Sequence, residues 1–320
     1  MAFDATVRPS TVMNTARPDA AASRLTGAIG RVTVSVPVAQ TIAVRIDHLV
    51  DEIVSDPKAL RRTLPDVAAE VIELCGRSNA GAEMMERSLT RDPFISAQVV
   101  SIANSAMFAP RMPILGVRDA VVRIGLDAVR DVVLMVVANS TMYRVPGLTA
   151  EVEFMRRRML AAASVARLIA QALGAESEYG FLAGLLHDIG QLVVLERCAQ
   201  DGVVTAAIWA APEGDIVRER IHYHHTSAGA AICRAWKLPS GVVDAAEFHH
   251  DYHHDGKTHL AAHLVAAADA VVEYMVPGVS PPTIPVNQQP TILELGLEPA
   301  QIDNLVTRAR PAAAALIGAP

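Results

Sequence analysis

From about residue 46 to residue 145, apolar residues recur every three or four positions, which is the spacing of one face of an α-helix. Asp92 followed by Pro93 is typical of an N-cap and a first helical residue. The connections between apolar segments are short, so we expect a compact helical unit. The pattern predicts helices over 47–54, 66–75, 82–89, 93–104, 117–124 and 126–138.

A turn at Val145-Pro146-Gly147 separates this unit from a second one that extends to about residue 310. Its helices are predicted over 151–173, 178–186, 192–199, 215–225, 228–236, 240–250 and 258–274, with a last helix that begins near Glu298-Pro299. No alternation of strands and helices and no Gly-rich phosphate loop is present. The predicted fold class is therefore all-α, with two packed helical subdomains covering 46–145 and 146–310.

The two ends of the chain lack this periodicity. Residues 1 to about 30 are rich in Ala, Thr, Ser and Pro, a composition typical of a flexible segment. Residues 31–38 alternate like a short strand that Pro37 interrupts. We therefore expect a flexible or extended tail over 1–45 and a second tail over 311–320.

The composition narrows the class of protein. Hydrophobic residues make up 51% of the chain but aromatic residues only 4%, which favours closely packed helices. The net charge of −6 argues against a nucleic-acid-binding protein. Three scattered cysteines indicate neither a disulfide framework nor a zinc-thiolate site. The longest apolar run, 132–138, is too short to cross a bilayer, so we expect a cytoplasmic protein that does not enter a membrane.

A histidine and an aspartate are adjacent in an apolar run, LAGLLHDIGQLVV at 182–194. Burying polar groups without partners is costly, so His187 and Asp188 need an explanation. In one interpretation Asp188 caps or anchors a neighbouring helix and His187 is a core residue with satisfied hydrogen bonds. In the other, both side chains ligate a divalent cation.

Nine of the eleven histidines fall between His222 and His263, which favours metal chemistry. His259 and His263 share a helix face, but no HExxH pattern is present, and we expect the histidines from 253 to 263 on a solvated surface. His225, His249 and Asp269 lie in or beside apolar helical segments instead. A buried Asp269 would require a cation or several hydrogen-bond donors.

Three successive arginines, Arg156, Arg157 and Arg158, begin the long helix of the second unit. Successive helical residues rotate by about 100°, so the three fan over roughly 200°. At least one of them is expected to turn toward the protein.

Several motifs in this order resemble the HDOD family, the HD-related output domain of bacterial signalling. The resemblance covers about residues 60–310. Its N-terminal part is carried by LPDVAAEVIEL (64–74), SLTRDPFISAQVVSIANSAMF (88–108) and VRDAVVRIGLDAVRDVVL (117–134). Its HD-like part is carried by GFLAGLLHDIG (180–190), HHTSAGAAICRAWKLP (224–239), VVDAAEFHH (242–250), LVAAADAVV (264–272) and LGLEPAQIDNLV (295–306).

The resemblance implies a ligand set inherited from metal-dependent HD phosphohydrolases. In that set the His-Asp pair is His187 and Asp188, the late aspartate is Asp269, and the additional histidines are His225, His249 and His250. The early histidine of the catalytic relatives is replaced here by Arg158. HDOD domains commonly lack parts of this set and are regarded as non-catalytic, so no catalytic residue is assigned.

Arg158 changes the expected chemistry, because a guanidinium is permanently cationic and does not ligate metals. One hypothesis is that Arg158 replaces the charge of the metal, pairs with Asp188 or Asp269 and holds the site inactive, so that no cofactor is needed. The opposing hypothesis is that Arg158 points away and a weaker divalent-metal site survives.

Two classes of function follow from the resemblance. The first is a non-catalytic signalling module that binds a partner protein or a nucleotide-like second messenger, with Arg157 and Arg158 as ligand or phosphate contacts. The alternative is a metal-dependent phosphodiesterase or phosphohydrolase that acts on a cyclic dinucleotide or a related phosphoester, with Arg156 or Arg157 holding the phosphate.

Overall fold

The computed structural model describes residues 38–56, 64–105, 112–139, 145–174, 177–275 and 285–317. Within these ranges every regular element is a helix and no strand is formed, so the predicted all-α fold class is confirmed. The predicted strand and most of the predicted N-terminal tail, residues 1–37, lie outside the described residues. Among the described helices, none has both the length and the apolarity needed to cross a membrane.

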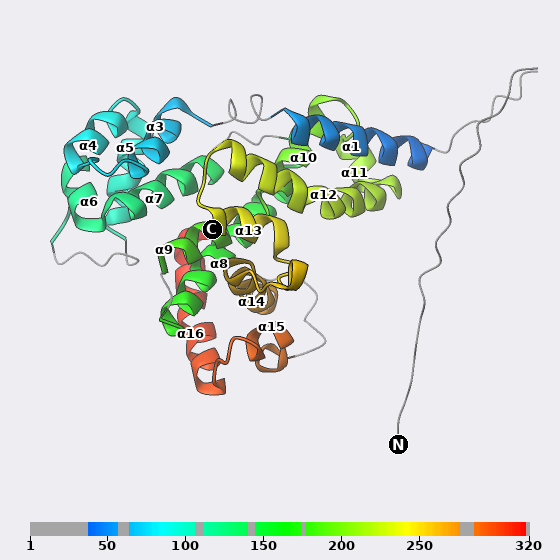
Figure 1. Ribbon diagram of the computed structural model, residues 1–320. Helices are drawn as coiled ribbons and strands as arrows, with labels where there is room; N and C mark the ends of the chain where they lie inside the picture. Colours follow the sequence, from blue (N-terminus) through cyan, green and yellow to red (C-terminus); the bar gives the residue numbers. More distant parts are fainter. Residues whose placement is uncertain are drawn as a thin grey trace, which may run out of the picture. The chain divides into compact units, whose positions relative to one another are not determined.

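Among the described residues, the first group consists of five helices that follow one another closely in the chain (Figure 1). Asp92 caps one of them by accepting hydrogen bonds from the backbone N–H groups of Phe94 and Ile95, at 2.9 and 3.0 Å. Gly125 has a φ of +83°, which separates two helices that would otherwise merge. The helices are α3 (Asp66–Cys75), α4 (Ala82–Leu89), α5 (Pro93–Ala103), α6 (Val117–Ile124) and α7 (Leu126–Asn139).

The second group is built around a long helix, α8 (Thr149–Ala172), which packs against α9 (Ser177–Leu186), α14 (Leu260–Met275) and α16 (Pro299–Ile317). Its buried face is rich in alanine, so neighbouring backbones approach closely. A Cβ on Gly184 of α9 would lie 2.6 Å from the Ala162 carbonyl oxygen. The remaining long helices are α10 (Ile189–Gln200), α12 (Glu213–Ala235) and α13 (Ser240–Phe248); α11 (Ala206–Ala210), α15 (Pro290–Leu293), η1 (His254–Gly256) and η2 (Val286–Gln288) are short.

The two groups pack on each other, because α7 contacts both α8 and α9. One continuous cluster of buried apolar side chains extends from the first group into α9, α10, α12 and α13. A second cluster joins α8, α14 and α16. The site described below lies where α8, α10, α12, α13 and α14 meet.

Several predicted boundaries differ from the structure by a few residues, and three differences change the description of the fold. The first described helix, α1 (Val38–Ser55), begins inside the predicted tail over 1–45, because Ile42, Ile46 and Leu49 are buried and the helix packs along α12 (Figure 1). At the other end α16 continues to Ile317, past the predicted boundary at 310. The helices predicted over 215–225 and 228–236 are one continuous helix, α12.

Candidate functional site

The six predicted metal ligands come together from four parts of the chain. His187 and Asp188 form the turn between α9 and α10, His225 lies on α12, His249 and His250 follow α13, and Asp269 lies on α14. Asp188 is at the centre. Its Oδ1 lies 3.3 Å from His225 Nε2 and 3.7 Å from His249 Nε2, and its Oδ2 lies 3.3 Å from His187 Nε2.

The interpretation of Asp188 as a helix cap does not describe its role for α10. Asp188 occupies the N-cap position of that helix, but its side chain makes no capping hydrogen bond. Its carboxylate is buried and faces the histidines instead. The carboxylate therefore belongs to the polar cluster and not to the end of the helix.

Backbone carbonyls fix the orientation of the three most buried histidines. His187 Nδ1 lies 2.9 Å from the Gly184 oxygen, His249 Nδ1 lies 2.9 Å from the Ala245 oxygen, and His225 Nδ1 contacts the His222 oxygen. A carbonyl oxygen only accepts, so each Nδ1–H donates. This is how metal-binding histidines are commonly oriented, with Nε2 directed at the ion.

The Nε2 atoms of His225, His249 and His250 lie close together. No N–H donor accounts for the approach of the first two. His225 Nε2 is 3.2 Å from His249 Nε2 and 3.2 Å from His250 Nε2. In their neutral forms, His225 and His249 present lone pairs to each other. Zinc–nitrogen bonds of 2.0–2.1 Å place neighbouring ligands of a tetrahedral site about 3.3 Å apart. The residues on this side of Asp188 therefore fit a divalent metal.

Arg158 lies in the site and does not point away from it. Its Nη2 donates to Asp269 Oδ1 at 2.9 Å and to Oδ2 at 3.1 Å. Glu273 lies 3.9 Å from the same nitrogen. The hypothesis that Arg158 pairs with Asp269 is confirmed in this geometry, and the carboxylate of the late aspartate is held by a cation of the protein itself.

The ionisable groups divide into a charged half and a neutral half. Burial opposes charge on His187, but the Asp188 and Asp269 carboxylates outweigh it and raise its pKa to about 9. The nearby imidazoles hold the pKa of Asp188 well below its usual range, against the effect of burial. Burial lowers the pKa of His225 to about 4 and that of His249 well below its ordinary value. Positive charge is thus concentrated on Arg158 and His187.

Gly190 sets the distance between the His-Asp turn and α12. A Cβ at this position would lie 2.0 Å from the His225 carbonyl oxygen and 2.7 Å from the Gly229 nitrogen. Only glycine permits this approach, which brings Asp188 within reach of His225. The glycine of the HDIG sequence is therefore part of the construction of the site.

A cavity of about 400 Å³ opens beside the polar cluster. Arg218 lies over the ring of Trp209, with its Cζ 5.0 Å from the ring centroid. The cavity therefore combines an aromatic surface with guanidinium groups. It is lined by Ala150, Glu151, Phe154, Met155, Arg158, Asp188, Gln191, Trp209, Arg218, Ile221 and His222.

The two arginines predicted as ligand contacts lie in different environments. Arg158 lines the cavity, but the lining residues do not include Arg157. The side chain of Arg157 is half exposed, and its Nε lies 3.4 Å from Glu153 Oε1. The structure therefore does not place Arg157 where a ligand in this cavity would meet it.

The expectation of a solvated surface for histidines 253–263 is wrong for His263 and for His259, whose side chain is only 16% exposed and lies 3.1 Å from Asp244. His253 and His254 are half exposed. His263, however, is buried, stacks on Tyr252 with ring centroids 4.2 Å apart, and donates through Nε2 to the Thr291 oxygen at 2.8 Å. It is a core residue with satisfied hydrogen bonds, and the packing of η2 and α15 against α14 explains its burial.

Three residues of the site were not singled out from the sequence: His222, Trp209 and Arg218. His222 lies three residues before His225 and faces the same way on α12. The predicted helix over 215–225 contains both residues, so their spacing of three was a signal that the sequence offered. Trp209 and Arg218 carry no recognisable signal, because a short helix and a bend bring them together.

A sequence model of the HDOD domain matches residues 62–252, which is more than half of the chain. The chain belongs to the HDOD domain family. The match includes the His-Asp turn and the histidines of α12 and α13, and it ends before α14, which carries Asp269.

Solved structures share the fold at low sequence identity. One is a candidate metal-dependent phosphohydrolase from Shewanella amazonensis SB2B, with a TM-score of 0.64, 20% identity and coverage of 88% of this chain and 99% of that one. Another is an HDOD domain protein of unknown function from Geobacter sulfurreducens, with a TM-score of 0.61, 19% identity and coverage of 87% and 98%. A candidate signal transduction protein from Marinobacter aquaeolei VT8 has a TM-score of 0.62, 21% identity and coverage of 90% and 67%.

An uncharacterised protein from Treponema pallidum (strain Nichols) is 24% identical over 168 residues. The alignment covers 51% of this chain and 32% of that protein, so the chain matches only about a third of its relative's length.

Proposed function

We propose that this chain is a non-catalytic signal-transduction module that binds a nucleotide-like ligand or a partner protein. The observation that carries the proposal is the pair between Arg158 and Asp269. A guanidinium at the position of the early histidine neutralises the late aspartate and repels a divalent cation from its carboxylate. The name of the Marinobacter aquaeolei structure, a candidate signal transduction protein, agrees with this proposal.

The cavity supports a ligand that carries both an aromatic ring and a phosphate. Arg158 and Arg218 supply fixed cations that match phosphate oxygens. Trp209 supplies an aromatic face, which already holds the Arg218 guanidinium. Nucleotides, including cyclic dinucleotides, combine these two features.

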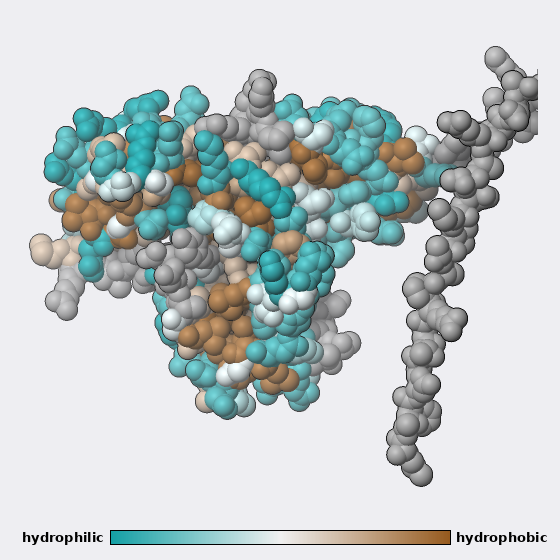
Figure 2. Space-filling model, viewed as in Figure 1, coloured by the Kyte–Doolittle hydropathy of each residue, from teal (hydrophilic) through white to brown (hydrophobic). Residues whose placement is uncertain are grey.

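A second surface supports a protein partner. Several large apolar side chains are exposed in the first group of helices and in the segment that precedes α6, and Figure 2 shows apolar surface over this region. Exposed apolar patches commonly mark interaction sites. The residues concerned are Phe94, Met112, Leu115 and Val122, which are 60–88% exposed.

The ligand proposal is tested by calorimetry on the full chain with mononucleotides and cyclic dinucleotides. One of these ligands is expected to bind, and Trp209→Ala and Arg218→Ala are expected to weaken its binding by at least tenfold. Arg87→Ala is the control, because Arg87 is exposed on α4 and pairs only weakly with Glu83. Equal loss in all three variants, or binding of none of the ligands, would reject the cavity as the ligand site.

The alternative function, a metal-dependent phosphodiesterase or phosphohydrolase, is favoured by one observation: the convergence of Nε2 atoms from His225, His249 and His250. These residues, with Asp188, would hold the ion, which supplies Lewis-acid polarisation of a phosphoryl oxygen. Turnover of a cyclic dinucleotide or simple phosphodiester that Asp188→Ala abolishes would establish this function and reject the non-catalytic one.

A further inference from the structure

We propose that His222, His225 and His250 form a binding site for a divalent transition-metal ion such as Zn²⁺, beside the position that Arg158 blocks. His222 is not among the residues that the resemblance to HD phosphohydrolases implies as ligands. The inference shares His225 and His250 with the ligand set of the alternative function and exchanges His249 for His222; such an ion would serve a signalling module and a hydrolase alike.

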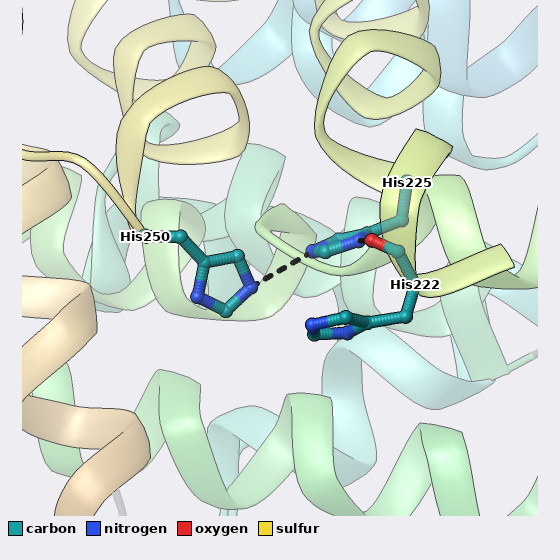
Figure 3. Close-up of side chains that lie close together, drawn as sticks. All are labelled: His222, His225 and His250. Carbon is teal, nitrogen blue, oxygen red and sulfur yellow. Dashed lines mark hydrogen bonds between the residues drawn. The ribbon is translucent and has the colours of Figure 1, made fainter. Parts of the chain in front are cut away.

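The three rings face one another closely enough for one ion (Figure 3). One potential ligand atom from each of the three side chains lies within 4.8 Å of the others. The ring centroids are 5.2 Å apart for His222 and His225, 5.3 Å for His222 and His250, and 5.1 Å for His225 and His250. Small rotations of the exposed rings would bring all three nitrogens to tetrahedral spacing.

The backbone supplies a rigid base for the site. His222 and His225 are one turn apart on α12, and their rings are inclined by only 26°. The His222 carbonyl oxygen also accepts from His225 Nδ1, so the same residue orients its partner. His250 follows α13, and its Nε2 lies 3.2 Å from His225 Nε2.

The chemistry of the three side chains selects the type of ion. Imidazole nitrogens suit Zn²⁺ and similar ions, whereas Mg²⁺ and Ca²⁺ prefer oxygen ligands. Asp188 Oδ1 lies 3.3 Å from His225 Nε2, and its carboxylate would offset the charge of an ion. His225 is buried, but His222 and His250 are exposed, so an ion can enter from solvent.

The site would present an open coordination position to a ligand. Three protein ligands leave a fourth position free in tetrahedral zinc sites. His222 also lines the cavity that holds Arg158, Trp209 and Arg218. An anionic oxygen of a molecule in that cavity is the natural fourth ligand.

The experiment is a Zn²⁺ titration of the chelator-treated full chain by calorimetry, with Co²⁺ absorption as a report on coordination. One ion per chain and the visible bands of four-coordinate Co²⁺ are expected. Changes to residues that only orient metal ligands lower affinity by about 10–100-fold, so His222→Ala should lower it by at least about 100-fold. His48→Ala is the matched control, since His48 is an exposed histidine on α1.

A second variant separates this site from the inherited one. The double variant Arg158→Met/Asp269→Asn removes the ion pair at Asp269, the late aspartate of the ligand set that the resemblance implies. The net charge does not change, so the affinity for Zn²⁺ should stay within about threefold of the wild-type value. Unchanged affinity in His222→Ala would overturn the proposal: loss in the double variant would then place the ion beside Asp269, and unchanged affinity in both would place it on His225, His249 and Asp188. Absence of stoichiometric binding to the folded wild-type chain would also overturn it. Equal unfolding temperatures confirm that His222→Ala is folded.

Discussion

Arg158 on α8 and Asp269 on α14 are 111 residues apart in sequence, yet they share two hydrogen bonds of 2.9 and 3.1 Å. The pair joins two helices that pack on each other along their alanine-rich faces. Both side chains are largely buried, with 22% and 17% of their surface exposed. The arginine therefore ties α8 to α14 through a largely buried ion pair.

Removing both members of this pair should cost less than the sum of the two single removals. Asp269→Asn leaves a largely buried guanidinium without its main counter-charge, and we expect a loss of about 3 kcal/mol in the free energy of unfolding. Arg158→Met/Asp269→Asn should lose clearly less than the sum of the two single variants. Urea unfolding monitored by circular dichroism measures all three values. Strictly additive losses would contradict coupling between the two side chains.

The close approach at Gly190 should tolerate no side chain. Gly190→Ala places a methyl group 2.0 Å from the His225 carbonyl oxygen, and overpacking of this kind costs about 1–3 kcal/mol or more. Gly241→Ala on α13 is the matched control, because its Cβ would meet only the Ala261 methyl at 3.6 Å. The free energy of unfolding of Gly241→Ala should be unchanged or higher by up to about 1 kcal/mol, because alanine has a higher helix propensity than glycine. Thermal unfolding of both variants tests the difference.

The attachment of α1 should depend on apolar packing more than on its surface ion pairs. Ile46 is fully buried, so Ile46→Ala should cost about 2–5 kcal/mol. Glu52 is half exposed and pairs with Arg197 at 2.9 Å, so Glu52→Gln should cost less than about 1 kcal/mol. Amide hydrogen exchange in α1 should speed up more in Ile46→Ala than in Glu52→Gln. Larger destabilisation by Glu52→Gln would mean that the ion pairs hold the helix.

The three thiols should be unreactive in the folded protein. Burial raises the pKa of Cys198 and of Cys233 to about 12 and that of Cys75 to about 11. The thiolate is the reactive form, so a disulfide reagent at pH 8 should modify native Cys198 and Cys233 extremely slowly. Cys75 is only partly buried and should react first. In the denatured chain all three cysteines should react at once and release three equivalents of the reagent's thiol per chain, which serves as the control.

Helix ends marked by local chemistry were predictable from the sequence. The bounds of α3, α4 and α6 agree with the predicted ranges, and a proline or glycine flanks every one of these ends except the C-terminal end of α4, where Thr90 follows. The start of α1 and the continuity of α12 were not predictable. The start of α1 and the continuity of α12 depend on each other, since α1 packs along α12. Tertiary packing of this kind overrides the local helix propensity of the sequence.

The types of residue in the site were predictable, but their arrangement was not. The sequence placed His187, Asp188 and the later histidines in apolar surroundings, and the structure brings them together. Which of the arginines enters the protein depends on the rotation of α8 about its axis, which no local pattern determines. Arg158 faces inward and Arg157 faces solvent for this reason. His222 and His225 share a face of the predicted helix over 215–225, but only the structure shows that His250 lies against both of them.

The unbroken course of α12 has a mechanical consequence. A helix of this length, 23 residues, spans about 35 Å. It touches the cavity through Ile221 and His222, the His-Asp turn through His225 and Gly229, and α1 along its side. A stiff helix with these three attachments fixes the spacing of the cavity, the His-Asp turn and α1 relative to one another.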